Sequence, residues 1–116
     1  MRVLIVDDDA DFRRWLRACL SSDERFEIIG EAKNGGEAVA LAVELTPDLV
    51  LMDISMPIMN GLDATAEIYG ICPDATVVIV SGLNNSDAEV AGVAGVTGRI
   101  QKSEFTVAAL VELLGQ

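Results

Sequence analysis

Short apolar runs recur along this chain at regular intervals, and they constrain its fold more than any other feature. Three of the four clear runs are continuous rather than alternating, which is typical of strands buried on both faces of a parallel sheet. A weaker fifth run covers Thr97–Gln101 and has Ile100 as its main apolar residue. The clear runs are Val3–Val6, Phe26–Ile29, Leu49–Met52 and Val77–Val80.

Helical patterns fill the intervals between these runs. Asp9 or Asp11 can cap the start of the first helix. Strand and helix therefore alternate five times, which predicts an α/β fold with one doubly wound sheet of five parallel strands between two layers of helices. No linker or repeat divides the sequence, so residues 1–116 are expected to form a single domain. The expected helices cover residues 12–20, 38–45, 62–71 and 105–114, with a weak one at 87–94.

Charge and composition exclude several classes of function. The net charge of −11 repels nucleic acid phosphates, so direct binding of DNA or RNA is not expected. No apolar run approaches the roughly 18–20 residues of a membrane span, and the first residues do not resemble a signal peptide, so we expect a soluble cytoplasmic protein. The sequence contains no histidine, which excludes a Ser-His-Asp triad, a histidine metal site and a phosphohistidine on this chain.

Polar residues stand where the predicted strands end. Asp7 and Asp8 follow the first strand, Asp53 the third, Ser81 the fourth and Lys102 the fifth. In doubly wound sheets, sites form beyond the carboxyl ends of the strands, near the point where the strand order reverses. We therefore expect these carboxylates, the hydroxyl and the ammonium to converge at one edge of the sheet.

Crowded carboxylates repel one another, which raises their pKa values or requires a cation. Without histidine or a cysteine pair the available ligands are oxygens, which suit Mg²⁺ or Mn²⁺ better than zinc. A carboxylate beside such a metal can attack phosphorus as a nucleophile, while a lysine and a hydroxyl hold the other phosphoryl oxygens. The pattern thus favours phosphoryl chemistry.

The candidate residues lie within longer stretches that together are highly specific. Asp53, Pro57 and Gly61, with the acidic pair upstream, form the strongest part. Over nearly its whole length the chain resembles the receiver domains of bacterial two-component response regulators. The stretches that carry the resemblance are residues 3–9, 34–38, 47–61, 78–82 and 95–102.

This resemblance implies a role for each matching residue. Asp53 corresponds to the phosphoacceptor, Asp8 to a direct metal ligand and Asp7 to a ligand that acts mostly through water. The backbone carbonyl of Ser55 corresponds to the third protein ligand of Mg²⁺. The groups expected to hold the phosphoryl oxygens are the Ser81 hydroxyl, the Lys102 ammonium and the amides of Ile54 and Gly82.

The resemblance also implies a flavodoxin-like strand order of 2-1-3-4-5 and a partner histidine kinase or phosphotransfer protein as the phosphoryl donor. It implies a signalling domain rather than an enzyme, which switches conformation or forms a homodimer. Residues 26–32, and Ser103 where many receivers have proline after a cis bond, resemble receivers that usually carry a helix-turn-helix output domain. Control of transcription is therefore the expected output, although these residues contain no such domain.

Three positions depart from the family pattern. Arg99 stands where receivers usually place an aromatic residue that swings inward, Gly82 replaces the usual alanine, and Gly92 weakens the fourth helix. Burying an unpaired guanidinium is costly, so we expect Arg99 to stay outward or to pair with an acid.

Two alternatives follow from the same residues. The first is an atypical receiver that binds its partner independently of phosphorylation, which Arg99 and Gly92 favour and the intact acidic set opposes. The second is a phosphatase resembling the haloacid dehalogenases. That family needs an aspartate two residues after its nucleophile, and Ser55 occupies this position.

Overall fold

The computed structural model describes residues 1–82, 90 and 92–115 and contains one parallel sheet. Its five strands lie in the order β2-β1-β3-β4-β5, so the expected fold class and strand order are confirmed. The strands are β1 (Arg2–Val6), β2 (Glu27–Ala32), β3 (Leu49–Met52), β4 (Thr76–Ser81) and β5 (Val96–Gln101). The helices are α1 (Ala10–Ser21), α2 (Gly35–Leu45), α3 (Gly61–Ile71) and α5 (Val107–Leu113), with a short 3₁₀ helix at Lys102–Glu104.

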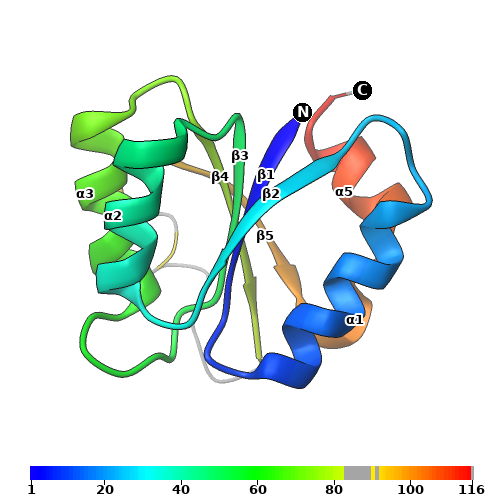
Figure 1. Cartoon of the computed structure of the whole chain (residues 1–116), viewed down its shortest axis with the longest axis horizontal. Coiled ribbons are helices and arrows are strands. Elements are labelled where there is room, and N and C mark those ends of the chain that lie inside the picture. Colours follow the sequence, from blue (N-terminus) through cyan, green and yellow to red (C-terminus); the bar gives the residue numbers. More distant parts are fainter. Residues whose placement is uncertain (83–89, 91, 116) are drawn as a thin grey trace.

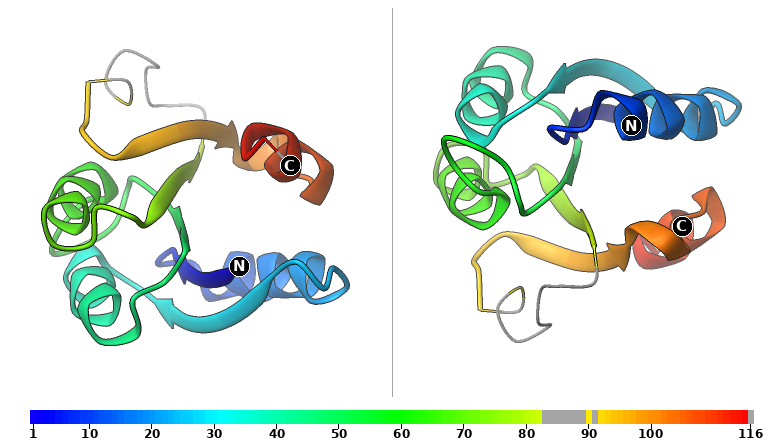
Figure 2. Two further views of the ribbon diagram at one scale, coloured as in Figure 1. Left: turned by 90° about the horizontal axis from the view of Figure 1, so that it is seen from above. Right: turned by 90° about the horizontal axis from the view of Figure 1, so that it is seen from below.

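Helices cover both faces of this sheet and give the molecule three layers (Figures 1 and 2). α2 and α3 cover one face, and α1 and α5 cover the other. Each face has its own apolar core, one including Val6, Val50 and Ile68 and the other including Ile5, Leu51 and Leu110. Because both faces are covered, β3 is fully buried along its length, which explains its continuous apolar sequence.

Side-chain caps fix where most of the helices begin. Asp9 accepts hydrogen bonds from the backbone amides of Asp11 and Phe12, so Asp9 is the cap of α1. The alternative cap, Asp11, was wrong, since it lies inside the first turn of that helix. The last helix begins at Val107 rather than at residue 105, because the side chain of Thr106 caps it by accepting from Ala109.

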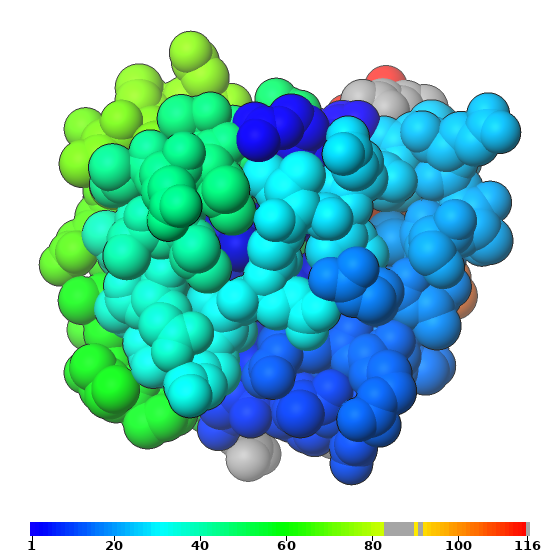
Figure 3. Space-filling model, in the orientation of Figure 1, coloured from blue at the N-terminus to red at the C-terminus, as the bar shows by residue number. Residues whose placement is uncertain are grey.

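The edge strand β2 differs from its predicted bounds. β2 begins one residue later than predicted and continues to Ala32, because pairing with β1 extends to the Val6–Ala32 pair. This edge strand is visible at the surface between α1 and α2 (Figure 3). The weak helix expected over residues 87–94 lies largely outside the described residues. No helix in the described ranges is both long and apolar enough to cross a membrane.

Candidate functional site

Three aspartates meet at the carboxyl ends of the central strands, at the lower edge of the sheet in Figure 1. One carboxylate oxygen from each of Asp7, Asp8 and Asp53 lies within 4.8 Å of the others. Asp7 is 1% exposed and Asp53 is 5% exposed, whereas Asp8 is exposed to solvent. The sheet order places β1 beside β3, which explains why residues far apart in sequence form this cluster.

Backbone contacts fix the two buried aspartates. The amide of Asp7 donates to the Ala32 carbonyl of β2, and the amide of Asp53 donates to the Val6 carbonyl of β1. The following helix packs directly behind Asp53. A Cβ atom at Gly61 would lie 1.8 Å from the Asp53 carbonyl oxygen, so only glycine fits there.

Lys102 supplies the positive charge of the site from the end of β5. Its Nζ lies 2.8 Å from Oδ2 of Asp7 and 3.6 Å from Oδ2 of Asp53. The same ammonium lies 4.6 Å from the centre of the Phe12 ring, which adds a cation–π contact. Burial alone would lower the Lys102 pKa, but its pairing with the two carboxylates outweighs this and raises the pKa.

Burial and crowding raise the pKa values of the two buried acids. Burial raises the pKa of Asp7, and the pairing with Lys102 opposes that rise. Burial and the neighbouring Asp7 charge raise the pKa of Asp53 from 3.8 to about 6, against the opposing charge of Lys102. The site therefore stores like-charge repulsion that one ammonium does not cancel.

The remaining predicted residues take different positions around this cluster. Ser81 ends β4 and is fully buried, and its hydroxyl has no hydrogen-bond partner among the described residues. The Ile54 amide donates to Oδ1 of Asp53 at 2.9 Å, which leaves Oδ2 facing Lys102. Ser55 is exposed in the loop two residues beyond Asp53. A buried hydroxyl without a partner is costly unless a ligand uses it.

Arg13 contacts the site, although the sequence analysis did not include it among the site residues. Its Nη1 donates to the Asp7 carbonyl at 2.6 Å, and its Nε pairs with Glu31 of β2 at 3.1 Å. Arg17, one helical turn later, pairs with the other oxygen of Glu31 at 2.7 Å. The spacing of four residues places both arginines on one face of α1, and this pattern could have indicated an acidic partner.

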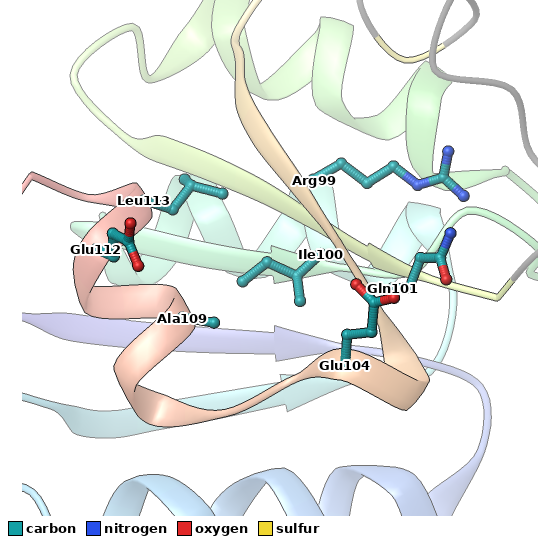
Figure 4. A pocket seen from close by; sticks show the side chains of 7 residues that line it. All are labelled: Arg99, Ile100, Gln101, Glu104, Ala109, Glu112 and Leu113. Carbon is teal, nitrogen blue, oxygen red and sulfur yellow. The ribbon is translucent and has the colours of Figure 1, made fainter.

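Arg99 is half-buried on β5, and its Nη2 donates to the Gly82 carbonyl at 3.0 Å. Arg99 and Ile100 leave the strand on opposite sides, and Ile100 points toward α5 (Figure 4). The guanidinium therefore reaches the backbone directly after Ser81. The sequence does not predict this interaction, since it favours a side chain that points outward or pairs with an acid.

All the donors in the cluster are oxygens, and three are carboxylates within mutual reach. Such a donor set suits a hard divalent cation. The family model that describes the response regulator receiver domain matches residues 3–114. The chain belongs to the response regulator receiver domain family. Receiver domains generally bind Mg²⁺ at an acidic pocket, and the aspartate cluster fits that requirement.

The receiver's relatives by sequence include a chemotaxis protein and a protein-glutamate methylesterase. It is 49% identical over 82 residues to chemotaxis protein CheY of Thermotoga maritima, covering 71% of this chain and 68% of that protein. It is 47% identical over 88 residues to the protein-glutamate methylesterase/protein-glutamine glutaminase of Caldanaerobacter subterraneus, covering 76% of this chain and 24% of the relative. The receiver thus spans about a quarter of the methylesterase's length.

Solved structures of similar fold come from more than one kind of regulator. The response regulator domain of Thermotoga maritima CheB superposes with a TM-score of 0.78 at 34% identity, covering 99% of this receiver and 91% of that chain. A DNA-binding response regulator of the LuxR family from Staphylococcus aureus gives a TM-score of 0.86 at 27% identity, with 98% and 95% coverage. Both likenesses extend over nearly the whole receiver.

Proposed function

We propose that this receiver accepts a phosphoryl group on Asp53, in the cytoplasm, from a partner histidine kinase or phosphotransfer protein. The observation that carries the proposal is the convergence of Asp53 with two further aspartates and Lys102. It is supported by Ser81 at the end of the neighbouring strand β4, whose buried hydroxyl lacks a partner within the described ranges. A structural cluster of caps would not need an ammonium between two buried carboxylates. We propose a signalling role, whose chemistry is limited to the receiver's own phosphorylation and dephosphorylation.

The side chains suit these roles in the following way. Because the pKa of Asp53, about 6, lies below neutral pH, most of the Asp53 carboxylate is ionised at pH 7 and the nucleophile is available. Because Ile54 occupies Oδ1, Oδ2 is the oxygen that attacks phosphorus as the bond from phosphorus to the donor nitrogen breaks. Lys102 and Ser81 then hold phosphoryl oxygens, which satisfies the buried hydroxyl.

Asp7, Asp8, Asp53 and the carbonyl of Ser55 would hold Mg²⁺, with Mn²⁺ as a substitute. The ion, when bound, offsets the carboxylate repulsion and withdraws charge from the phosphoryl group. Lys102 is already paired with Asp7 and Asp53, so it would balance the charge that remains after binding.

Phosphorylation with a small acyl phosphate tests the assignment. Incubation with acetyl phosphate and Mg²⁺ should add one phosphoryl group that hydroxylamine removes, as measured by mass spectrometry of the intact chain. Asp53→Asn should abolish the adduct. Asp9→Asn is the matched control, because asparagine also caps helices and the change in charge is the same. An undiminished adduct in Asp53→Asn would refute the phosphoacceptor and favour a phosphorylation-independent interaction module.

Two processes have support as the output that this receiver controls, namely transcription and chemotaxis. The resemblance of residues 26–32 and the likeness to a LuxR-family regulator favour control of transcription. The relatives at 47% and 49% identity are a methylesterase and a chemotaxis protein, which favour chemotaxis. Over nearly the whole chain, identity is also higher to the CheB receiver structure, at 34%, than to the LuxR-family structure, at 27%. We therefore propose chemotaxis as the process and keep transcription as the second candidate.

A further inference from the structure

Ile58, in the loop between β3 and α3, combines two unfavourable features. Its side chain is 86% exposed, and its backbone φ is +70°. Positive φ is a genuine outlier for a β-branched residue, and glycine or asparagine would adopt it at lower cost. Water contact for a large apolar side chain is also unfavourable. Neither feature helps the domain to fold, so stability does not explain isoleucine at this position.

The turn that carries Ile58 is held firmly in place. The Met59 amide donates to the Pro57 carbonyl at 2.7 Å, which closes a three-residue turn around Ile58. Such turns with positive φ at the centre are rare and strained. The loop is tied on both sides, because Gly35 donates to the Met59 carbonyl and Gly61 donates to the Ile54 carbonyl. These bonds therefore hold the backbone of Ile58 in place, with its side chain exposed to solvent.

A surface pocket of about 630 Å³ lies beside this turn, between the loop and the outer face of α3. Two of its walls are methionines, whose flexible side chains adapt to different partners. These methionines also pack against the core, which helps to hold this side of the pocket in place. The apolar lining consists of Met56, Ile58, Met59 and Ala66.

The rim of the pocket is acidic. Asp63 and Glu67 line it and are both exposed, four residues apart on α3, where like charges repel. None of the ion pairs formed within the described ranges includes either residue. Asp63 gains from the helix dipole at the start of α3, but Glu67 lies beyond the first turn, where that effect has faded.

We propose that this pocket is a docking surface for a partner protein segment that presents an apolar side chain beside lysine or arginine residues. The apolar side chain packs against Ile58 and the methionines, and the cations pair with Asp63 and Glu67. A net charge of −11 and this acidic rim repel nucleic acids and anionic membranes, so charge complementarity favours a cationic protein segment. The proposal does not depend on phosphorylation of Asp53.

An amphipathic helical peptide of leucine and lysine serves as the probe, and amide NMR spectra of the labelled domain, without phosphodonor, locate its binding. Shifts should saturate and be concentrated at residues 56–67. The double variant Asp63→Asn/Glu67→Gln should lower the affinity for the peptide by about fivefold or more, as expected for the loss of two surface charge pairs. Ile58→Asn should also weaken it, while melting no lower than the wild type because asparagine tolerates positive φ.

Two controls separate docking from general attraction to an acidic protein. Glu44→Gln/Asp74→Asn removes two exposed charges outside the pocket and should leave the affinity within about twofold, because only screened long-range attraction is lost. A peptide with the same lysines but serine in place of leucine should give no saturating shifts at residues 56–67. Shifts spread over all acidic surfaces, or equal losses in both double variants, would overturn the proposal.

Discussion

Replacing Asp53 by asparagine should stabilise the metal-free receiver at neutral pH, although it removes the proposed phosphoacceptor. The Asp53 pKa rises from 3.8 to about 6 because the carboxylate is buried and faces Asp7. One pKa unit corresponds to about 1.4 kcal/mol, so the ionised carboxylate costs the folded state about 3 kcal/mol above pH 6. Asparagine carries no charge, and its side-chain oxygen can still accept from the Ile54 amide.

The raised pKa of Asp53 determines how the stability difference between the wild type and Asp53→Asn changes with pH. Below about pH 3, Asp53 is protonated in the folded and unfolded states, so the carboxyl costs nothing and both proteins should be similarly stable. As pH rises from about 4 to 6 the unfolded state loses its proton first, and the wild type loses stability relative to Asp53→Asn. Above pH 6 the difference should be constant at about 3 kcal/mol.

Urea unfolding in EDTA, followed by the fluorescence of the single tryptophan Trp15, measures this difference. A gain of 3 kcal/mol corresponds to a midpoint about 2 M higher, for a denaturant slope of about 1.5 kcal/mol/M. Asp74→Asn, an equal charge change at an exposed turn, controls for net charge. Added Mg²⁺ should narrow the gap, because it stabilises the wild type more. If Asp53→Asn is no more stable than Asp74→Asn at pH 7.5, the argument from burial and crowding fails.

Three further changes test other parts of the site. Lys102→Met leaves the buried carboxylate of Asp7 without its cation and should cost about 1–2 kcal/mol at pH 7 in the same urea assay; unchanged stability would show that the pair contributes nothing. Gly61→Ala places a methyl group on the Asp53 carbonyl and should cost about 3 kcal/mol or more, whereas Gly70→Ala, with open space around it, serves as the control and should not destabilise. Beryllofluoride with Mg²⁺ should shift the Ser81 amide strongly in NMR spectra while the Arg99 guanidinium stays half-exposed. An Arg99 side chain that becomes fully buried would indicate the ordinary family switch.

The sequence predicted the sheet and the acidic cluster for related physical reasons. Continuous apolar runs report burial on both faces of a strand, and strand ends in a parallel sheet share one edge. The positions of Asp7, Asp53 and Lys102 at strand ends are therefore enough to place them together. The roles of these residues in phosphorylation remain proposals that the experiments above test.

Features that depend on contact between distant elements could not be predicted in the same way. The hydrogen bond from Arg13 to the Asp7 carbonyl depends on how α1 lies against β1, and a hydrophobic pattern does not specify that. The sequence also does not predict the positive φ of Ile58, because isoleucine is among the residues least expected in that conformation. The bond from Arg99 to Gly82 belongs to the same class, since it joins a residue within β5 to the residue that follows β4.

The pairing of Lys102 with Asp7 has a consequence for folding kinetics. The two residues lie near opposite ends of the chain, so their ion pair can form only after β5 has docked at the far edge of the sheet. Long-range contacts of this kind form late, because closing such a loop costs chain entropy. Any partly folded species in which β1 already pairs with β3 would hold Asp7 and Asp53 together before their cation arrives. The rate of refolding should therefore depend on the cations in solution.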